Sequence, residues 1–244
     1  MRILVEIITE KIPLNNNRYL TLSLIKNVLE KQSPELFKAM YENDENYNYR
    51  TKPFTYSLKL NDFKIVGDEF ELKGNSTISI STPDPVLGSI LYNGFLLTKE
   101  YEYNKKYKLS IGRVTLLKEK KVNSNEVLFK TLSPLVIKNR RGEFLKIDNE
   151  NYEKELNYIA NKVLESYRGF GLKESLIFQP ILMKKRVAKE KIEKFTKETN
   201  KDIFYITGYE GVFKLTGNKE DLNLIYNLGL GVRRSSGFGM LQIV

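Results

Sequence analysis

The chain has 244 residues, of which 40 are Lys or Arg and 30 are Asp or Glu, so its net charge at neutral pH is +10. Hydrophobic residues make up 41% of the sequence, which is enough for a sizeable core and excludes an intrinsically disordered chain. The sequence contains neither cysteine nor histidine, which excludes disulfides, thiolate metal sites and every catalytic triad that depends on histidine.

The excess of positive charge indicates a polyanionic partner, nucleic acid first and an acidic membrane surface second. Charge alone is equally compatible with a basic protein that has no such partner. No apolar stretch reaches the roughly 20 residues needed to cross a bilayer. The segment Met1 to Glu10 is too short and too charged for a signal peptide. We therefore expect a cytoplasmic protein without a membrane partner, and neither a metal ion nor a cofactor.

The first half of the sequence predicts a strand, two helices, a group of strands, a helix and a last strand. Residues 1–10 alternate in hydrophobicity, as strands do, and a polar turn at 13–17 leads into a segment with leucines at helical spacing. Ser33-Pro34-Glu35 is typical of a second helix start, with Ser as the N-cap and Pro at the first helical position. After a polar loop at 43–51, the expected elements are strands at 54–60, 63–66 and 69–81, a helix at 85–97 and a strand at 106–118.

The second half predicts the same order again. The expected elements are a strand at 127–138, a helix at 152–167, strands at 175–184 and 204–216, a helix at 219–227 and a strand at 237–244. Strand, helix, two strands, helix and strand is the split βαβ pattern of a ferredoxin-like domain. We predict an α+β fold of two tandem ferredoxin-like (βαββαβ) domains, at residues 1–122 and 123–244, with a polar linker around 119–125.

The C-terminal segment contains two Gly-apolar-Gly triplets, Gly229–Gly231 and Gly237–Gly239, around a basic and hydroxylated centre. Glycines let the backbone approach another surface closely, and exposed N–H groups can bind phosphate oxygens. Arginine and serine side chains add donors that suit phosphate. A plain glycine-rich connection to an edge strand is the alternative. We predict a nucleic-acid-binding loop in which the contacts come from Gly229, Gly231, Arg233, Arg234, Ser235, Ser236, Gly237 and Gly239.

Four segments, in this order, resemble the motifs of one protein family. They are Ser33-Pro34-Glu35-Leu36, Lys52-Pro53-Phe54-Thr55-Tyr56-Ser57, Thr131-Leu132-Ser133-Pro134-Leu135-Val136 and the glycine-rich loop. Together they resemble the CRISPR-associated RAMP proteins, in particular the endoribonucleases that cut precursor CRISPR RNA within its repeats (the Cas-six, or Cas6, family). The resemblance covers nearly the whole chain and implies two ferredoxin-like domains.

The implied activity is metal-independent cleavage of CRISPR repeat RNA to give mature CRISPR RNA. The ribose 2′-hydroxyl attacks the phosphorus and leaves a 2′,3′-cyclic phosphate and a 5′-hydroxyl. This reaction needs a base, stabilisation of charge on the phosphate and a proton for the leaving oxygen.

The resemblance also identifies candidate catalytic residues. Many family members have a tyrosine on the first helix, a histidine shortly before the Lys-Pro-Phe segment, and the lysine of that segment. This sequence matches the lysine with Lys52 but places Lys26 and Tyr41 at the other two positions. A register shift of one or two residues would instead place Ala39 at the histidine position, as an engineered substitution, and the sequence leaves both assignments open.

Lys52, Tyr41 and Lys26 are therefore the candidate catalytic residues. A lysine can stabilise a pentavalent phosphorane, and its pKa falls when it is desolvated beside other cations. Tyrosine, with an unperturbed pKa of about 10, is a poor base at neutral pH. We therefore expect slow cleavage in which orientation of the scissile phosphate supplies most of the acceleration.

Further RNA contacts are expected outside the glycine-rich loop. Tyr47 and Tyr49 with Arg50 interleave aromatic and basic side chains, as base-stacking surfaces do. Basic runs are often only solvated faces, so these assignments are hypotheses. The remaining candidates lie on the first helix and after two predicted strands, at Arg18, Lys138, Arg140, Arg141, Lys184, Lys185 and Arg186.

The sequence is compatible with three functions. The first is the repeat-specific endoribonuclease, with precursor CRISPR RNA as its partner and other CRISPR effector subunits as further ones. The second, motivated by the missing histidine, is a non-catalytic member that binds repeat RNA or serves as an effector-complex subunit. The third is a basic ferredoxin-like pair from translation or ribosome assembly that binds structured RNA. The sequence is compatible with a monomer or a homodimer.

Overall fold

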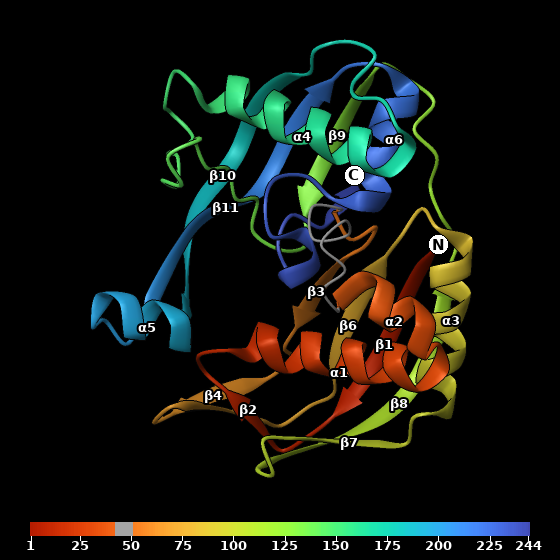
Figure 1. Cartoon of the computed structure of the whole chain (residues 1–244), viewed down its shortest axis with the longest axis vertical. Coiled ribbons are helices and arrows are strands. Elements are labelled where there is room, and N and C mark those ends of the chain that lie inside the picture. Colours follow the sequence, from red (N-terminus) through yellow and green to blue (C-terminus); the bar gives the residue numbers. More distant parts are fainter. Residues whose placement is uncertain (42–50) are drawn as a thin grey trace.

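The computed structural model describes residues 1–41 and 51–244, so Tyr47, Tyr49 and Arg50 lie outside the described residues. Figure 1 shows two halves stacked along the long axis, the N-terminal half below and the C-terminal half above. Each half has its own hydrophobic core of buried side chains. Within these two ranges, no helix is long and apolar enough to cross a membrane.

The N-terminal half is built on an antiparallel sheet with the strand order β3-β6-β1-β8-β7, next to a small sheet with the order β2-β5-β4. Its elements are β1 (Arg2–Ile8), β2 (Lys11–Pro13), α1 (Asn17–Gln32), α2 (Pro34–Tyr41), β3 (Thr55–Lys59), β4 (Phe63–Val66), β5 (Glu69–Leu72), β6 (Ser76–Ser81), α3 (Pro85–Leu97), β7 (Glu100–Tyr103) and β8 (Tyr107–Leu117).

Helices α1 and α3 pack side by side against one face of this sheet (Figure 1). The buried face of α1 includes Leu24, Ile25 and Val28, which recur at helical spacing. Helix α3 begins where its local sequence dictates, because the Asp84 side chain accepts hydrogen bonds from the backbone N–H groups of Val86 and Leu87. The apolar faces of both helices thereby fix α1, which carries Lys26, over the sheet.

The C-terminal half repeats the pattern with the strand order β10-β11-β9-β12. Its elements are β9 (Glu126–Thr131), α4 (Tyr152–Arg168), β10 (Ile177–Glu190), α5 (Glu193–Thr199), β11 (Phe204–Thr216), α6 (Lys219–Leu228), the 3₁₀ turn η1 (Arg234–Ser236) and β12 (Leu241–Ile243). In both halves the second and third strands of the βαββαβ unit pair with each other, and the third lies next to the first. The predicted α+β fold of two tandem ferredoxin-like units is confirmed.

Strands β10 and β11 form a long hairpin, here called the β10–β11 arm, which carries α5 at its tip (Figure 1). The arm runs down from the upper half and reaches the level of α1. Contact is made through Asn16, whose side chain accepts a hydrogen bond from the Lys191 N–H at 2.7 Å and donates to the Lys191 carbonyl at 3.3 Å. The arm therefore links the C-terminal half to the start of α1.

Several predicted boundaries were wrong for identifiable reasons. The strand expected at 69–81 is two strands, because residues 73–75 turn away and the Asn75 carbonyl accepts a hydrogen bond from the Asn61 side chain. The strand expected at 127–138 ends at Thr131, before Pro134, which has no N–H to donate to a ladder. The strand expected at 237–244 is only β12, and the short elements β2, β7 and α5 were not predicted. The domain division after Val122 stays a prediction.

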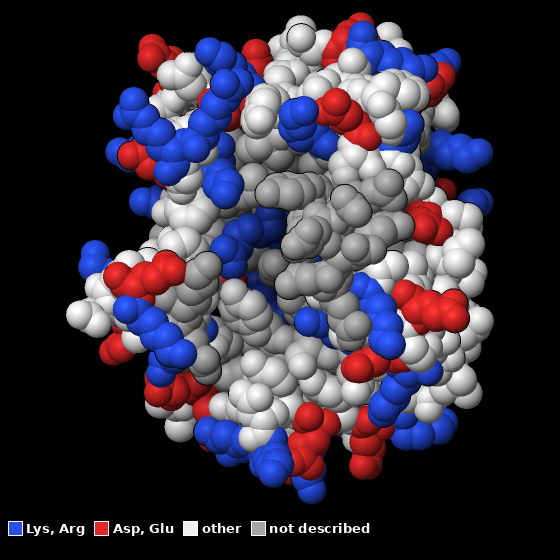
Figure 2. Space-filling model, viewed as in Figure 1, with Lys and Arg blue, Asp and Glu red and all other residues white. Residues whose placement is uncertain are grey.

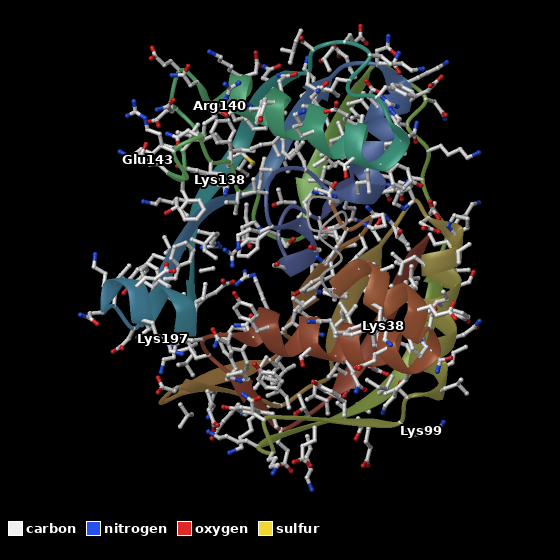
Figure 3. All side chains as sticks on the ribbon, viewed as in Figure 1. Lys38, Lys99, Lys138, Arg140, Glu143 and Lys197 are labelled. Atoms are coloured by element: carbon white, nitrogen blue, oxygen red, sulfur yellow. The ribbon has the colours of Figure 1, made fainter. Side chains whose placement is uncertain are left out.

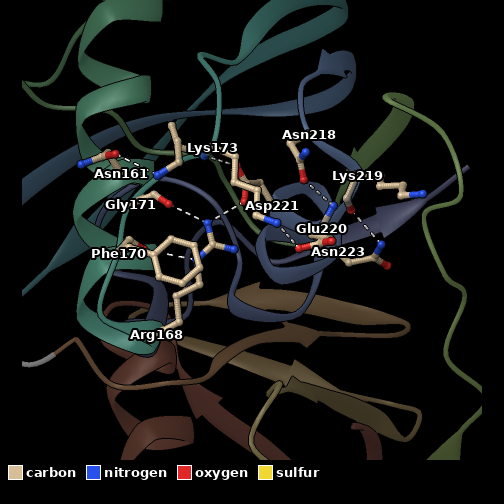
Figure 4. Close-up of polar contacts among 11 residues, drawn as sticks. Asn161, Arg168, Phe170, Gly171, Lys173, Asn218, Lys219, Glu220, Asp221 and Asn223 are labelled. Carbon is tan, nitrogen blue, oxygen red and sulfur yellow. Dashed lines mark hydrogen bonds and ion pairs between the residues drawn. The ribbon is translucent and has the colours of Figure 1, made fainter.

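A polar network at the top of the C-terminal half, here called the Arg168–Asp221 network, ties the end of α4 to the start of α6 (Figure 4). Asp221 is fully buried, and its carboxylate accepts hydrogen bonds from the Arg168 guanidinium at 2.6 Å and the Lys173 N–H at 2.7 Å. Arg168 also donates to the Gly171 carbonyl at 2.6 Å. The charges of this network are compensated within the protein.

Candidate functional site

Three of the four segments that carry the family resemblance are far apart in the sequence but meet between the two halves. The Thr55 hydroxyl donates to the backbone carbonyls of Arg234 and Phe238, at 3.3 and 3.1 Å. The Ser133 hydroxyl accepts a hydrogen bond from the Met240 N–H at 3.0 Å. The Lys-Pro-Phe segment, the Ser-Pro segment and the glycine-rich loop therefore form one junction.

The glycines of the loop serve close packing. Gly229, Gly231, Gly237 and Gly239 are all buried and all have positive φ. A Cβ on Gly239 would lie 1.9 Å from the Leu230 carbonyl oxygen, so only glycine fits there. The Gly239 N–H donates to the Pro134 carbonyl at 2.9 Å. The four glycines therefore pack against protein, and their predicted contact with RNA stays a prediction.

The two adjacent arginines of the loop have different surroundings. Arg234 is 5% exposed and donates to the Leu228 carbonyl at 2.6 Å, and burial lowers its pKa to about 10. Its guanidinium is thus enclosed by protein, and the predicted contact of Arg234 with RNA stays a prediction. Arg233, Ser235 and Ser236 are half-buried, and their contact with RNA stays a prediction.

Arg233 joins the loop to the β10–β11 arm. Its guanidinium donates to a carboxylate oxygen of Glu190 at 2.6 Å and to the Tyr19 hydroxyl at 3.3 Å. Glu190 is 2% exposed, and burial raises the pKa of its carboxyl although Arg233 opposes this. Arg233 therefore holds loop, arm and α1 together while remaining partly accessible.

The three candidate catalytic residues come together in one cluster. The Nζ atom of Lys26, on α1, lies over the Tyr41 ring at 4.4 Å from its centre. The Nζ atom of Lys52, just before β3, lies over the same ring at 4.7 Å. We call Lys26 and Lys52 the lysine pair. The alternative candidate Ala39 is exposed on α2. The ammonium groups of the lysine pair lie over the ring of Tyr41.

No carboxylate of residues 1–41 or 51–244 forms an ion pair with Lys26 or Lys52. Burial, and secondly the positive charge of Lys26, lower the pKa of the Lys52 ammonium. Burial raises the pKa of Tyr41 far above its usual value. The cluster thus presents two cations without a counter-ion in the described chain, and a tyrosine that stays neutral.

The position of Lys52 is fixed from both halves. The Thr51 N–H donates to the Ser166 hydroxyl of α4 at 3.0 Å. On the other side, the Thr82 hydroxyl donates to the Pro53 carbonyl at 2.6 Å, and Phe54 is buried in the N-terminal core. Lys52 therefore sits at the junction, three residues before the Thr55 contact with the glycine-rich loop.

Other predicted RNA-binding residues lie elsewhere on the surface. Lys138, Arg140 and Arg141 are exposed, and Figure 3 places Lys138 and Arg140 beside the arm. Lys184 and Lys185 are exposed on β10, whereas Arg186 is paired with Glu210 at 2.9 Å. Figure 2 shows Lys and Arg side chains gathered over this upper left part of the molecule.

A cleft of about 830 Å³ lies between the arm and the N-terminal half, and Figure 2 shows a hollow there with Lys or Arg atoms inside it. Arg18, Arg186 and Lys189 supply its cations. Arg18 donates to the Gly237 carbonyl at 3.2 Å and its guanidinium lies over the Phe238 ring. The predicted contacts Arg18 and Arg186 therefore share one cleft next to the glycine-rich loop.

Some residues that shape the site were missed by sequence reasoning. Arg2 on β1 crosses between the halves, donating to the carbonyls of Tyr226 at 2.8 Å and Leu241 at 2.6 Å. Nothing around Arg2 or Glu190 in the sequence signals these contacts, which depend on partners more than forty residues away. Among the described residues, no group of His, Cys, Asp and Glu could hold a metal ion.

Comparison with known proteins gives consistent matches. The family model described as "CRISPR associated protein Cas6, C-terminal" matches residues 117–243. The chain is 29% identical over 258 aligned positions to the CRISPR-associated endoribonuclease Cas6 of Pyrococcus furiosus, covering all of this chain and 90% of that protein.

Two solved structures extend the similarity to the fold. A Cas6-related protein from Pyrococcus furiosus has a TM-score of 0.81 at 19% identity, covering all of this chain and 98% of the other. A structure described as "An RAMP protein binding different RNA substrates" has a TM-score of 0.79 at 20% identity, covering all of this chain and 99% of the other.

Proposed function

This chain belongs to the Cas6 family of CRISPR-associated proteins, and we propose that it is an endoribonuclease that cleaves CRISPR repeat RNA without a metal ion. The observation that supports cleavage is the lysine pair, two cations around Tyr41 with no carboxylate paired to them in the described chain. A phosphate group would supply the negative charge that residues 1–41 and 51–244 do not place there.

In the proposed reaction, Lys26 and Lys52 bind non-bridging oxygens of the scissile phosphate. The 2′-hydroxyl attacks in line, and the two ammonium groups stabilise the charge that develops on the phosphorane. Lys52, whose pKa is lowered, donates a proton to the leaving 5′-oxygen. The products are a 2′,3′-cyclic phosphate and a 5′-hydroxyl. Since no histidine is available as base, the 2′-proton passes to solvent and the reaction is slow.

Binding of the RNA on either side of the scissile phosphate is assigned to the accessible basic residues. These make contacts to phosphates that fix the register of the RNA without reading its bases. They are Arg18, Lys138, Arg140, Arg141, Lys184, Lys185, Arg186 and Arg233, with the hydroxyls of Ser235 and Ser236.

A second candidate function is a family member that binds repeat RNA without cutting it. Two observations favour it: the chain has no histidine, and the Tyr41 hydroxyl is buried. In that case the lysine pair serves as a phosphate-binding site, either alone or within an effector complex.

The deciding experiment incubates the protein, in excess and in EDTA, with its own CRISPR repeat RNA. We expect one cut per repeat, a 2′,3′-cyclic phosphate on the upstream product, and no cut when the scissile ribose is 2′-deoxy. Tight, salt-dependent binding with intact RNA after long incubation would support the second function. A cut that persists in the 2′-deoxy substrate would contradict attack by the 2′-hydroxyl.

A further inference from the structure

Two ammonium groups lie over the Tyr41 ring, yet the Tyr41 hydroxyl takes no part in their arrangement. The ring centre is 4.4 Å from the Lys26 Nζ atom and 4.7 Å from the Lys52 Nζ atom. The hydroxyl oxygen is buried and makes no hydrogen bond to any residue of 1–41 or 51–244. The polar atom that a catalytic tyrosine would use is therefore enclosed, whereas the ring carries the contacts.

An aromatic ring is a suitable neighbour for two cations that must stay free. Its faces carry negative potential and attract ammonium groups within about 6 Å of the ring centre. A carboxylate in the same place would neutralise the lysines and compete with a phosphate for them. The ring attracts Lys26 and Lys52 without cancelling their charge, which offsets part of their mutual repulsion.

The ring has a defined orientation because α2 holds it. Phe37 lies one helical turn before Tyr41, and the two rings stack with centres 5.3 Å apart. The Lys26 Nζ atom also lies 5.8 Å from the centre of the Phe37 ring. Three elements, α1, α2 and the segment before β3, therefore meet at this aromatic pair.

We propose that Tyr41 is a positioning residue that acts through its ring: it holds the ammonium groups of Lys26 and Lys52 together, charged and open to the scissile phosphate, while its hydroxyl transfers no proton. The burial of the hydroxyl and the raised pKa of Tyr41 agree with this role. The effect on cleavage rests on the proposed function, whereas the effect on the two lysines does not.

The first arm of the test measures single-turnover cleavage at saturating enzyme for Tyr41→Phe and Tyr41→Leu. Tyr41→Phe keeps the ring and should cleave at close to the wild-type rate. Tyr41→Leu removes the ring's attraction and should lower the rate roughly 10-fold. Loss of cleavage in Tyr41→Phe equal to that in Tyr41→Leu would overturn the proposal, because the hydroxyl would then be required.

The second arm replaces Tyr41 with phenylalanine, difluorophenylalanine and trifluorophenylalanine. These rings have nearly the same shape, but fluorine withdraws the negative potential from their faces. We expect the cleavage rate to fall stepwise with fluorination, which a role in packing alone would not produce. An unchanged rate across the series would overturn the proposal, and this series remains informative where Tyr41→Leu fails to fold.

The third arm does not depend on cleavage. The lysines are labelled by reductive ¹³C-methylation, which retains their charge, and their pKa values are followed by NMR, with Lys26→Arg and Lys52→Arg assigning the two signals. In Tyr41→Leu the pKa of Lys52 should fall further below its usual value, because the ring no longer favours the charged form, and in Tyr41→Phe it should not. Unchanged titration in Tyr41→Leu would overturn the inference. If wild type and all Tyr41 variants leave the repeat RNA uncut, that result rejects only the proposed function.

Discussion

The Arg168–Asp221 network and the lysine pair are two charged clusters that differ in whether the described residues pair their charges. In the first, a fully buried carboxylate is matched by a guanidinium and a backbone N–H within 2.7 Å. In the second, two ammonium groups share an aromatic ring and have no carboxylate partner among the described residues. The charges of the first cluster are matched within the protein, whereas the described part of the chain places no carboxylate against the second.

A substitution in the first cluster should therefore change stability, and one in the second should change RNA binding and cleavage. Breaking a matched buried ion pair leaves an uncompensated charge and costs stability. Replacing Lys26 or Lys52, which have no carboxylate partner among the described residues, relieves repulsion and desolvation. The folded protein should then gain stability and lose affinity for an anion. Unfavourable local energies of this kind, kept at one place in an otherwise stable protein, are typical of functional sites.

Asp221→Ala should show the largest effect on stability. It leaves the Arg168 guanidinium without its buried partner and should lower the free energy of unfolding by about 3–5 kcal/mol. Urea denaturation measures this, and the exposed neighbour Glu220, paired with Lys173, supplies the control in Glu220→Ala. An unfolding midpoint for Asp221→Ala equal to that of the control would show that the two clusters do not differ as described.

Arg234→Ala applies the comparison to the glycine-rich loop. The variant leaves the Leu228 carbonyl without its donor at a buried position and should cost about 1–3 kcal/mol of stability. The exposed residue Arg140 provides the control, since Arg140→Ala should leave thermal unfolding unchanged. A stable Arg234→Ala protein that loses RNA affinity would instead support the predicted contact between Arg234 and RNA.

Lys184→Ala and Lys185→Ala test the exposed cations on the arm. Each should weaken repeat-RNA binding and reduce the slope of log K against log salt by roughly 0.7–0.9, the value for one lost phosphate contact. Fluorescence anisotropy across a salt series measures the slope. Lys99, exposed at the lower end of the N-terminal half (Figure 3), is the control. Equal slopes for all three variants would show that Lys184 and Lys185 of the arm do not contact the RNA phosphates.

Lys52→Met should show the smallest effect, a slight gain in stability at neutral pH. The pKa of Lys52 is lower in the folded protein than its usual value of 10.5, so folding disfavours its charged form. Between the lowered pKa and 10.5 the unfolded state binds more protons, and wild-type stability rises with pH. The advantage of Lys52→Met should therefore shrink across this window in pH-dependent denaturation. A variant that is less stable than wild type at neutral pH would contradict the sign.

The order of helices and strands could be predicted well, because the spacing of hydrophobic residues and the capping residues are signals within each segment. Helix α3 was placed correctly from Pro85 to Leu97, and in the structure Asp84 caps its start and Pro85 lies in its first turn. The short strands β2 and β7 were missed because their pairing partners, not their own residues, define them.

The site could be predicted only in part. The resemblance selected Lys26, Tyr41 and Lys52, but their common ring geometry depends on how α1, α2 and the segment before β3 pack. Arg233 and Arg234 are indistinguishable in the sequence. The backbone separates them, because Arg233 has a left-handed φ of 59° and the next residue turns into the protein.

We propose the lysine pair as the place where repeat RNA is cut. The most direct test compares the single-turnover rate of repeat-RNA cleavage in EDTA for wild type, Lys26→Ala, Lys52→Ala and the exposed control Lys38→Ala of helix α2 (Figure 3). We expect Lys52→Ala to lose about 100- to 1,000-fold in rate, Lys26→Ala to lose less and Lys38→Ala to match wild type, with no variant less stable than wild type in thermal unfolding. Cleavage at the wild-type rate by the Lys26→Ala/Lys52→Ala double variant would contradict it.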